Sequence, residues 1–353
     1  MKKIIIGILC FTFLTTYLSA ISSDSIVAIE QDSGRILYAK DENEIKLIAS
    51  ITKIMTAIIA CESGKLDNKV TINDSVLQSY GSGIYIEPGE IMTLRNLTYG
   101  LMLRSGNDAA LAIADYIADD EKEFAKLMNK KAKEIGMTNT LFNNASGLDE
   151  ETKNTSTSLD MSKLMAYALN NPDFTIITGT KKHVVKTNYK TYVWHNKNRL
   201  LNEYKYATGG KTGYTKKALR TLVTSANKNN MNLIITTLND PNDFTNHKNI
   251  YEELFNKYKS YLILDKNNFK VKDDTYYSDL YVINSFYYPL SNDELDSITL
   301  NINLEKIKRY KDDQKVGTVD VLFKGDVVHT EKIYATGKKM KKTFWDKFME
   351  IFK

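Results

Sequence analysis

Three short polar patterns follow one another along the chain: Ser50-Ile51-Thr52-Lys53, Ser105-Gly106-Asn107 and Lys211-Thr212-Gly213. In the first, the hydroxyl and the amine are three residues apart, so at the start of a helix they share one face. A serine is a weak nucleophile until a base takes its proton, and a lysine can do so only when burial or a nearby cation lowers its pKa. The first pattern therefore predicts a nucleophile, Ser50, with Lys53 as its general base.

The second pattern supplies groups that such a pair needs. Ser105 would extend the proton path toward the leaving group, and Asn107 offers an amide that can hold both Lys53 and the peptide group of a substrate. Lys211, in the third pattern, would be the cation that lowers the pKa of Lys53. These five side chains are the predicted catalytic set.

The third pattern predicts how a substrate is held. Lys211 and Thr212 would bind a free carboxylate by charge and by a hydroxyl hydrogen bond. Gly213 has no side chain, so a substrate backbone can approach and pair with this strand. The backbone N–H groups of Ser50 and Tyr214 form the predicted oxyanion hole. The predicted substrate-binding residues are Thr212, Gly213 and Tyr214.

A single pattern of this kind is weak, because Ser225-Ala226-Asn227-Lys228 repeats the first one by chance. That copy falls near the turn between two predicted strands, with no helix to present it. Three patterns in order, each in a suitable setting, are a far more specific signal.

The elements that must position these residues follow from periodicity and turn signals. Strands are expected at both ends of residues 21–264 and helices between them, which predicts an α/β (α+β) domain on an antiparallel sheet. The expected strands are 25–29, 36–39, 182–194, 218–226 and 231–238. The expected helices are 50–62, 93–103, 106–118, 121–135, 161–169, with Asp160 as its cap, and 247–262.

The remaining segments differ in character. Residues 265–337 hold short strand-like runs at 280–283, 298–304, 316–323 and 327–334, which predict a small all-β domain. Residues 1–20 read as an export signal, with an uncleaved anchor as the alternative. Residues 338–353 predict an amphipathic helix that lies on a membrane surface, or alternatively packs on its own domain.

Composition excludes other functions. Of the 353 residues 42% are hydrophobic and 26% charged, and the formal net charge of +5 is too balanced for a nucleic-acid-binding protein. Cys61, the single cysteine after the export signal, lies in an apolar helical pattern typical of a small buried side chain. The four histidines show no ligand spacing. We therefore expect no metal, no cofactor and no nucleic-acid partner.

The sequence resembles the low-molecular-weight penicillin-binding proteins, the serine D-alanyl-D-alanine carboxypeptidase family (peptidase family S11), which is related to the class A β-lactamases. The likeness extends beyond the three patterns and covers nearly the whole exported chain. Members of this family also carry a β-rich second domain and a C-terminal amphipathic anchor. The segments that carry the resemblance are 50–57, 105–110, 136–148 and 209–215.

The resemblance implies a penicillin-binding/β-lactamase-like fold and an enzyme that removes the terminal D-alanine of peptidoglycan stem peptides through an acyl-enzyme. It implies that Ser50 is acylated, also by β-lactam antibiotics, and that the protein acts at the outer face of the cytoplasmic membrane of a bacterium. Residues 216–220 depart from the family, which commonly has small residues there. Lys197 corresponds to a family basic residue near the carboxylate.

Three other readings share parts of this pattern. A β-lactamase would need a carboxylate for rapid deacylation, usually presented as Glu-x-x-Leu-Asn, and the chain has no such string. D,D-endopeptidase action on cross-links would use every motif seen here. A non-catalytic wall-binding scaffold would have no need for intact Ser50, Lys53 and Lys211.

Overall fold

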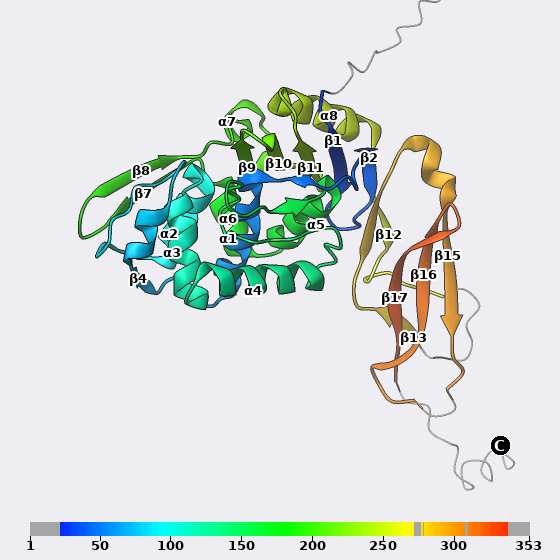
Figure 1. Ribbon diagram of the computed structural model, residues 1–353. Helices are drawn as coiled ribbons and strands as arrows, with labels where there is room; N and C mark the ends of the chain where they lie inside the picture. The colour runs from blue at the N-terminus through cyan, green and yellow to red at the C-terminus, as the bar shows by residue number, and fades with distance from the viewer. Residues whose placement is uncertain (1–21, 272–276, 278, 308–309, 338–353) are drawn as a thin grey trace, which may run out of the picture.

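Figure 1 shows the computed structural model, which describes residues 22–271, 277, 279–307 and 310–337. The expected export signal, 1–20, and the expected amphipathic helix, 338–353, lie outside these residues. Within the described residues, no helix combines the length and the apolar character needed to cross a membrane.

The first part of the chain is built on a five-stranded antiparallel sheet in the order β2-β1-β11-β10-β9. Successive residues of β1 pack into different cores, Ile26 and Ala28 on one face of the sheet and Val27 and Ile29 on the other. Burial on both faces explains why this strand is an unbroken apolar run. The strands are β1 (Ser25–Glu30), β2 (Ile36–Lys40), β9 (Ala207–Thr215), β10 (Leu219–Lys228) and β11 (Met231–Leu238).

Helices cover both faces of this sheet. Helix α5 (Ser158–Leu169) packs on β1 and β11 from one side, while α8 (Asp243–Lys257) packs on β10 and β11. The other helices are α1 (Lys53–Glu62), α2 (Leu94–Arg104), α3 (Asn107–Ala118), α4 (Glu121–Glu134), α6 (Pro172–Gly179) and α7 (Leu200–Glu203). Short two-stranded pairs join β3 (Lys46–Leu47) to β6 (Thr155–Ser156), β4 (Lys69–Thr71) to β5 (Ile91–Thr93), and β7 (Lys182–Lys186) to β8 (Thr191–His195).

Two expectations about helix ends are wrong. Asp160 is not the cap of α5, because the side chain of Thr157 accepts the hydrogen bond from the Asp160 N–H. The last predicted helix ends at Lys257, and the residues after it form strand β12 (Lys259–Leu264). That strand pairs with β14 (Phe286–Leu290), so a distant partner overrides the local helical pattern.

Among its described residues the C-terminal part consists of strands and one short 3-10 turn, Asn292–Ser297. In the first part, the described residues form two further 3-10 turns, Ala49–Thr52 and Asp74–Gln78. The antiparallel four-stranded sheet of the C-terminal part has the order β13-β17-β16-β15 and a core of its own. The strands are β13 (Asp279–Val282), β15 (Ile298–Leu304), β16 (Gln314–Phe323) and β17 (Asp326–Thr336). The four expected strands are confirmed, while β12 and β14 were not foreseen. We propose that the second domain begins at Lys259 rather than at residue 265.

Arg35, just before β2, joins the two parts. Its guanidinium lies 4.3 Å from the ring centroid of Phe323 and 5.1 Å from that of Tyr288. It also forms an ion pair with Glu294 at 2.7 Å, and the two side chains are only 10% and 14% exposed. Burial opposes the charge of Glu294, but the hydrogen bond and charge of Arg35, with hydrogen bonds from the Ser291 N–H and Lys324, lower its pKa to about 2. Cation–π contacts and a buried ion pair together stabilise the contact between the two parts of the molecule.

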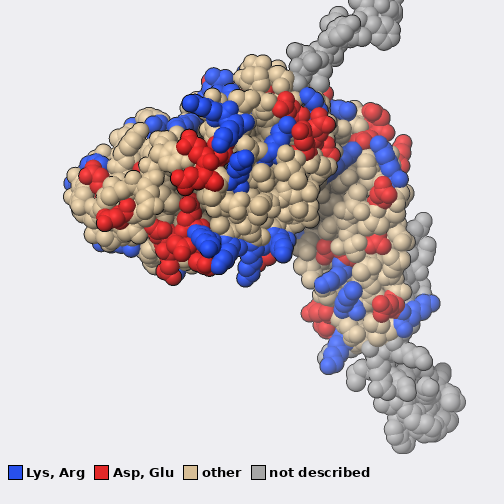
Figure 2. Space-filling model, in the orientation of Figure 1, with Lys and Arg blue, Asp and Glu red and all other residues tan. Residues whose placement is uncertain are grey.

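Charged side chains are mixed over the surface seen in Figure 2. Lysines and arginines alternate with aspartates and glutamates on both parts of the molecule. This distribution agrees with the balanced charge of the sequence.

Candidate active site

Ser50 lies in the 3-10 turn Ala49–Thr52, which leads directly into α1. The turn is tight: Ala49 has a φ of +48°, and a Cβ at Gly147 would stand 1.9 Å from the Ala49 carbonyl oxygen. Ser50 is partly exposed whereas Lys53 is fully buried. The expected placement at the start of a helix is confirmed.

The Lys53 amine is held by three acceptors. Its Nζ donates to Ser50 Oγ at 3.1 Å, to Asn107 Oδ1 at 2.7 Å and to the Ser146 carbonyl oxygen at 2.5 Å. Burial, and then the positive charge of Lys197, lower the pKa of Lys53 to about 7. A lysine with that pKa is neutral often enough near pH 7 to accept the proton of the adjacent hydroxyl.

Ser105 and Asn107 flank the break between α2 and α3. Ser105 ends α2 with a φ of +63°, a left-handed conformation that turns the chain sharply. Asn107 opens α3, and its Nδ2 donates to the Tyr80 carbonyl oxygen at 2.6 Å. That bond orients the amide so that its oxygen faces Lys53. The second pattern therefore meets the first in space, as predicted.

Lys211, on β9, reaches the same place from the sheet. Its Nζ donates to Ser105 Oγ at 3.0 Å and to the Thr212 carbonyl oxygen at 2.6 Å. Burial, with Lys53 and Lys197 close by, lowers its pKa as well. The cation whose charge lowers the pKa of Lys53 in the ligand-free protein is Lys197, and the role of Lys211 as a cation stays a prediction. A bound carboxylate would raise the pKa of Lys211 again.

Strand β9 leaves one edge open beside the nucleophile. It is the last strand of its sheet, so among the described residues no further strand pairs with it. A Cβ at Gly213 would lie 2.9 Å from Ser50 N and 2.3 Å from Thr221 Oγ1, which shows how closely β9 packs on the turn. Tyr214 is 62% exposed and Thr212 is partly exposed. An extended ligand could pair with this edge next to Ser50.

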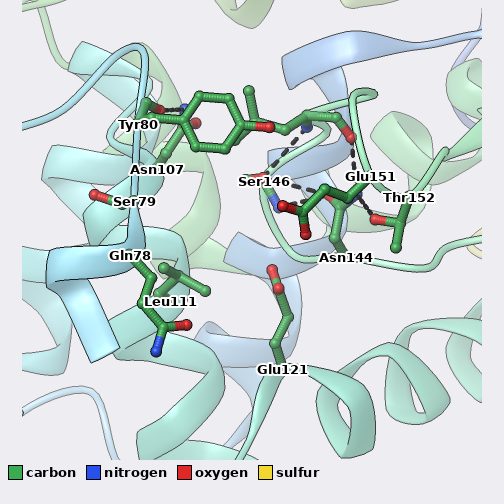
Figure 3. A pocket seen from close by; sticks show the side chains of 11 residues that line it. Gln78, Ser79, Tyr80, Asn107, Leu111, Glu121, Asn144, Ser146, Glu151 and Thr152 are labelled. Atoms are coloured by element: carbon green, nitrogen blue, oxygen red, sulfur yellow. Dashed lines mark hydrogen bonds between the residues drawn. The ribbon is translucent and has the colours of Figure 1, made fainter. Parts of the chain in front are cut away.

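A pocket of about 360 Å³ opens beside Asn107 and Ser146. Figure 3 shows Glu121 pointing from the start of α4 toward the loop that carries Asn144 and Ser146. Sequence reasoning missed Ser146 as a functional residue because it acts through its backbone carbonyl, which has no side-chain signature. The pocket is lined by Gln78, Ser79, Tyr80, Asn107, Leu111, Glu121, Asn144, Ser146, Leu148, Glu151 and Thr152.

The unusual segment 216–220 braces the edge of the site. Thr215 Oγ1 donates to Asp149 Oδ2 at 2.6 Å, and Lys217 Nζ donates to the Asp149 carbonyl oxygen at 2.8 Å. These bonds tie the β9–β10 turn to the loop that follows Ser146. The departure from small residues therefore adds a contact across the site.

Three residues that were not predicted to take part in catalysis are buried in the structure. Ser225 lies within β10, is 2% exposed and shares a hydrogen bond with Thr208 Oγ1 at 2.8 Å. Cys61 is buried in the main core, and burial raises its pKa to about 12. His247 is fully buried between Thr224 and Thr237, and burial lowers its pKa to about 3.

Comparison with known proteins agrees with this geometry. The profile of the Peptidase_S11 family, described as D-alanyl-D-alanine carboxypeptidase, matches residues 13–242. The chain belongs to this family. D-alanyl-D-alanine carboxypeptidase DacF of Bacillus subtilis (strain 168) is 38% identical over 250 residues, which are 66% of this chain and 64% of that relative. The match thus spans less than two thirds of the relative's length.

Solved structures extend the likeness to both parts of the chain. A D-alanyl-D-alanine carboxypeptidase from Mycobacterium tuberculosis H37Rv is 28% identical, covers 67% of this chain and 91% of its own, and has a TM-score of 0.64. Penicillin-binding protein 5 from Haemophilus influenzae is 24% identical, covers 90% of this chain and 97% of its own, and has a TM-score of 0.76. The predicted α/β, penicillin-binding/β-lactamase-like fold is confirmed.

Proposed function

We propose that this protein is a serine-type D-Ala-D-Ala carboxypeptidase that removes the terminal D-alanine of peptidoglycan stem pentapeptides. The observation that carries the proposal is the buried Lys53 amine, 3.1 Å from the partly exposed Ser50 hydroxyl and with its pKa lowered to about 7. Membership of the family and the name of its Bacillus relative support the same activity.

In the proposed reaction, neutral Lys53 takes the proton of Ser50 as the oxygen attacks the carbonyl between the two D-alanines. The N–H groups of Ser50 and Tyr214 stabilise the negative charge that develops on the carbonyl oxygen of the substrate. The Ser105 hydroxyl passes the proton taken by Lys53 on to the departing amine, the terminal D-alanine leaves, and the peptide stays on Ser50 as an ester. Water then hydrolyses the ester and frees the enzyme.

Substrate binding in this proposal uses the open edge of β9. The peptide lies along the strand, which the absence of a side chain at Gly213 lets pack directly on the turn that carries Ser50. The terminal carboxylate meets Lys211 and Thr212, and its charge keeps the lysine protonated. A β-lactam antibiotic presents a carboxylate and a strained amide in the same arrangement.

Incubation with a peptide that ends in D-Ala-D-Ala tests the proposal. We expect stoichiometric release of free D-alanine, and none from a matched peptide ending in D-Ala-L-Ala or from a Ser50→Ala variant. The soluble protein, residues 21–337, and a chromatographic assay of D-alanine suffice. Cleavage confined to cross-linked peptides would instead identify an endopeptidase, and no cleavage of either substrate would sink the assignment.

We also propose that the protein is exported by residues 1–20 to the outer face of the bacterial membrane and is held there by residues 338–353. In that last segment a helix would gather apolar side chains on one face and lysines beside them. Each buried apolar side chain contributes about 1.5–3 kcal/mol, and each lysine near anionic lipid about 1 kcal/mol. The apolar residues are Phe344, Trp345, Phe348, Met349 and Phe352.

Deletion of residues 338–353 is expected to release the signal-cleaved protein from membranes and to leave cleavage of a small soluble peptide nearly unchanged. The catalytic groups all lie before residue 215, which is why activity should survive. Sedimentation with anionic vesicles at low and high salt compares the two forms. Equal binding of both would show that the segment is not the anchor, and loss of peptide cleavage would show that it packs on the enzyme.

A further inference from the structure

Glu121 supports the backbone that holds Lys53. Its Oε1 accepts the N–H of Ala145 at 2.9 Å, and the next residue is Ser146, whose carbonyl accepts the Lys53 amine at 2.5 Å. Thr56 Oγ1 donates to the carbonyl of Ala145 at 2.7 Å. Ala145, the residue before Ser146, is thus held by α4 through its N–H and by α1 through its carbonyl.

The charge of Glu121 also reaches Lys53. Three ionisable groups act on the Lys53 amine: Lys197 disfavours its protonation, whereas Asp108 and Glu121 favour it. Glu151 borders the same pocket as Glu121, and Asp115 also faces Glu121.

The two acids are not equivalent. Both carboxylate oxygens of Asp108 accept backbone N–H groups, from Ile84 at 3.0 Å and Tyr85 at 2.6 Å among others, which offset its charge. Within the described residues Glu121 accepts the single N–H of Ala145 and borders the pocket, and burial raises its own pKa. Asp108 has the larger effect on the pKa of Lys53, but of the two acids only Glu121 also holds the backbone next to Ser146.

We propose that Glu121 is a positioning residue of the general base: it holds the backbone that places the Ser146 carbonyl on Lys53, and its charge favours the protonated form of the amine. The inference rests on the proposed function. It adds a residue that acts through another and touches no reacting atom.

Two substitutions separate the bond from the charge. Glu121→Gln keeps an oxygen that can accept the Ala145 N–H but removes the negative charge, whereas Glu121→Ala removes both. Without the charge the pKa of Lys53 falls, so more of the lysine is neutral below pH 7.

For Glu121→Gln we expect the rise of acylation rate with pH to move to lower pH, while the plateau above pH 8 stays within about twofold of the parent. For Glu121→Ala we expect the plateau to drop about tenfold, as for a lost hydrogen bond to a charged group.

The measurement is the second-order rate constant for acylation of the full chain without its signal by fluorescent penicillin, from pH 5 to 9, with thermal melting of each variant as the check on folding. Glu123→Gln, on the exposed side of the same helix, and Glu151→Gln, which lines the pocket beside Thr152, are matched controls that should leave the profile in place.

Each outcome decides a separate question. If the parent is acylated and Glu121→Gln keeps the parental pH profile, the inference about Glu121 is wrong and the proposed function stands. If Glu121→Gln acylates as the parent does but its acyl-enzyme no longer hydrolyses, Glu121 acts on the attacking water and not on Lys53, which also overturns the inference. If the parent itself is not acylated, the proposed function fails first.

Discussion

A single ester adduct on Ser50 is the expected product when this protein meets penicillin. The hydroxyl is partly exposed and stands 3.1 Å from the buried Lys53 amine, and β9 lies open beside it. The drug offers a strained amide where the peptide offers its own. Peptide mapping by mass spectrometry locates the adduct, and Ser50→Ala should abolish it, a loss of more than about a thousandfold in acylation.

Ser225 serves as the matched control, because it repeats the Ser-x-x-Lys spacing from inside a strand. Ser225→Ala should be labelled as fast as the parent. An adduct on Ser225 would refute the assignment of the nucleophile. We expect the Ser50 ester to be long-lived, and turnover of penicillin at many cycles per second would favour a β-lactamase.

Replacement of Lys53 with arginine is expected to lower acylation by about three orders of magnitude. An arginine keeps a positive charge but does not give up its proton in proteins, so it cannot serve as the base. The parent should acylate faster as the pH rises through about 7, because the pKa of Lys53 is lowered to that value and the neutral amine is the active form. Stopped-flow acylation with a chromogenic β-lactam across this range measures both effects.

Lys211→Arg tests the specificity of that loss. Its proposed task is to meet a carboxylate, which an arginine can still do, so the decrease should be much smaller. Parental acylation by Lys53→Arg would show that another group is the base. Equal melting temperatures of the two variants would exclude misfolding as the cause of a difference.

Much of the site could be predicted from the sequence because its side chains carry local signatures. The helical pattern after Ser50 predicted which residues share a face, and Lys53 lies where that face requires. For Asn107 and Lys211 the sequence could predict only that they lie near the nucleophile. Their exact contacts could not be predicted, because these join segments far apart in the chain. The roles of these residues stay predictions, although their proximity is now established.

What sequence reasoning missed has a physical reason in each case. Ser146 contributes a carbonyl, which every residue possesses. Lys197 was expected near a bound carboxylate, but its effect on the pKa of Lys53, exerted from a loop, has no sequence pattern. Strand β12 continues an apolar spacing that also suits a helix, and only its partner β14, well along the chain, decides between them.

The contact of Arg35 with Phe323 and Glu294 fixes the point from which the second sheet extends away from the first part. Strand β17 starts beside this contact and runs 11 residues away from it, roughly 35 Å at the usual rise of a strand. With distance from the contact the two parts separate, and the second sheet extends away from the first part (Figure 2). If residues after Thr336 bind a membrane surface, as proposed, the second sheet would hold Ser50 at a nearly constant distance from that surface. Peptides lying closer to that surface, or farther from it, would be out of reach unless they moved to the enzyme.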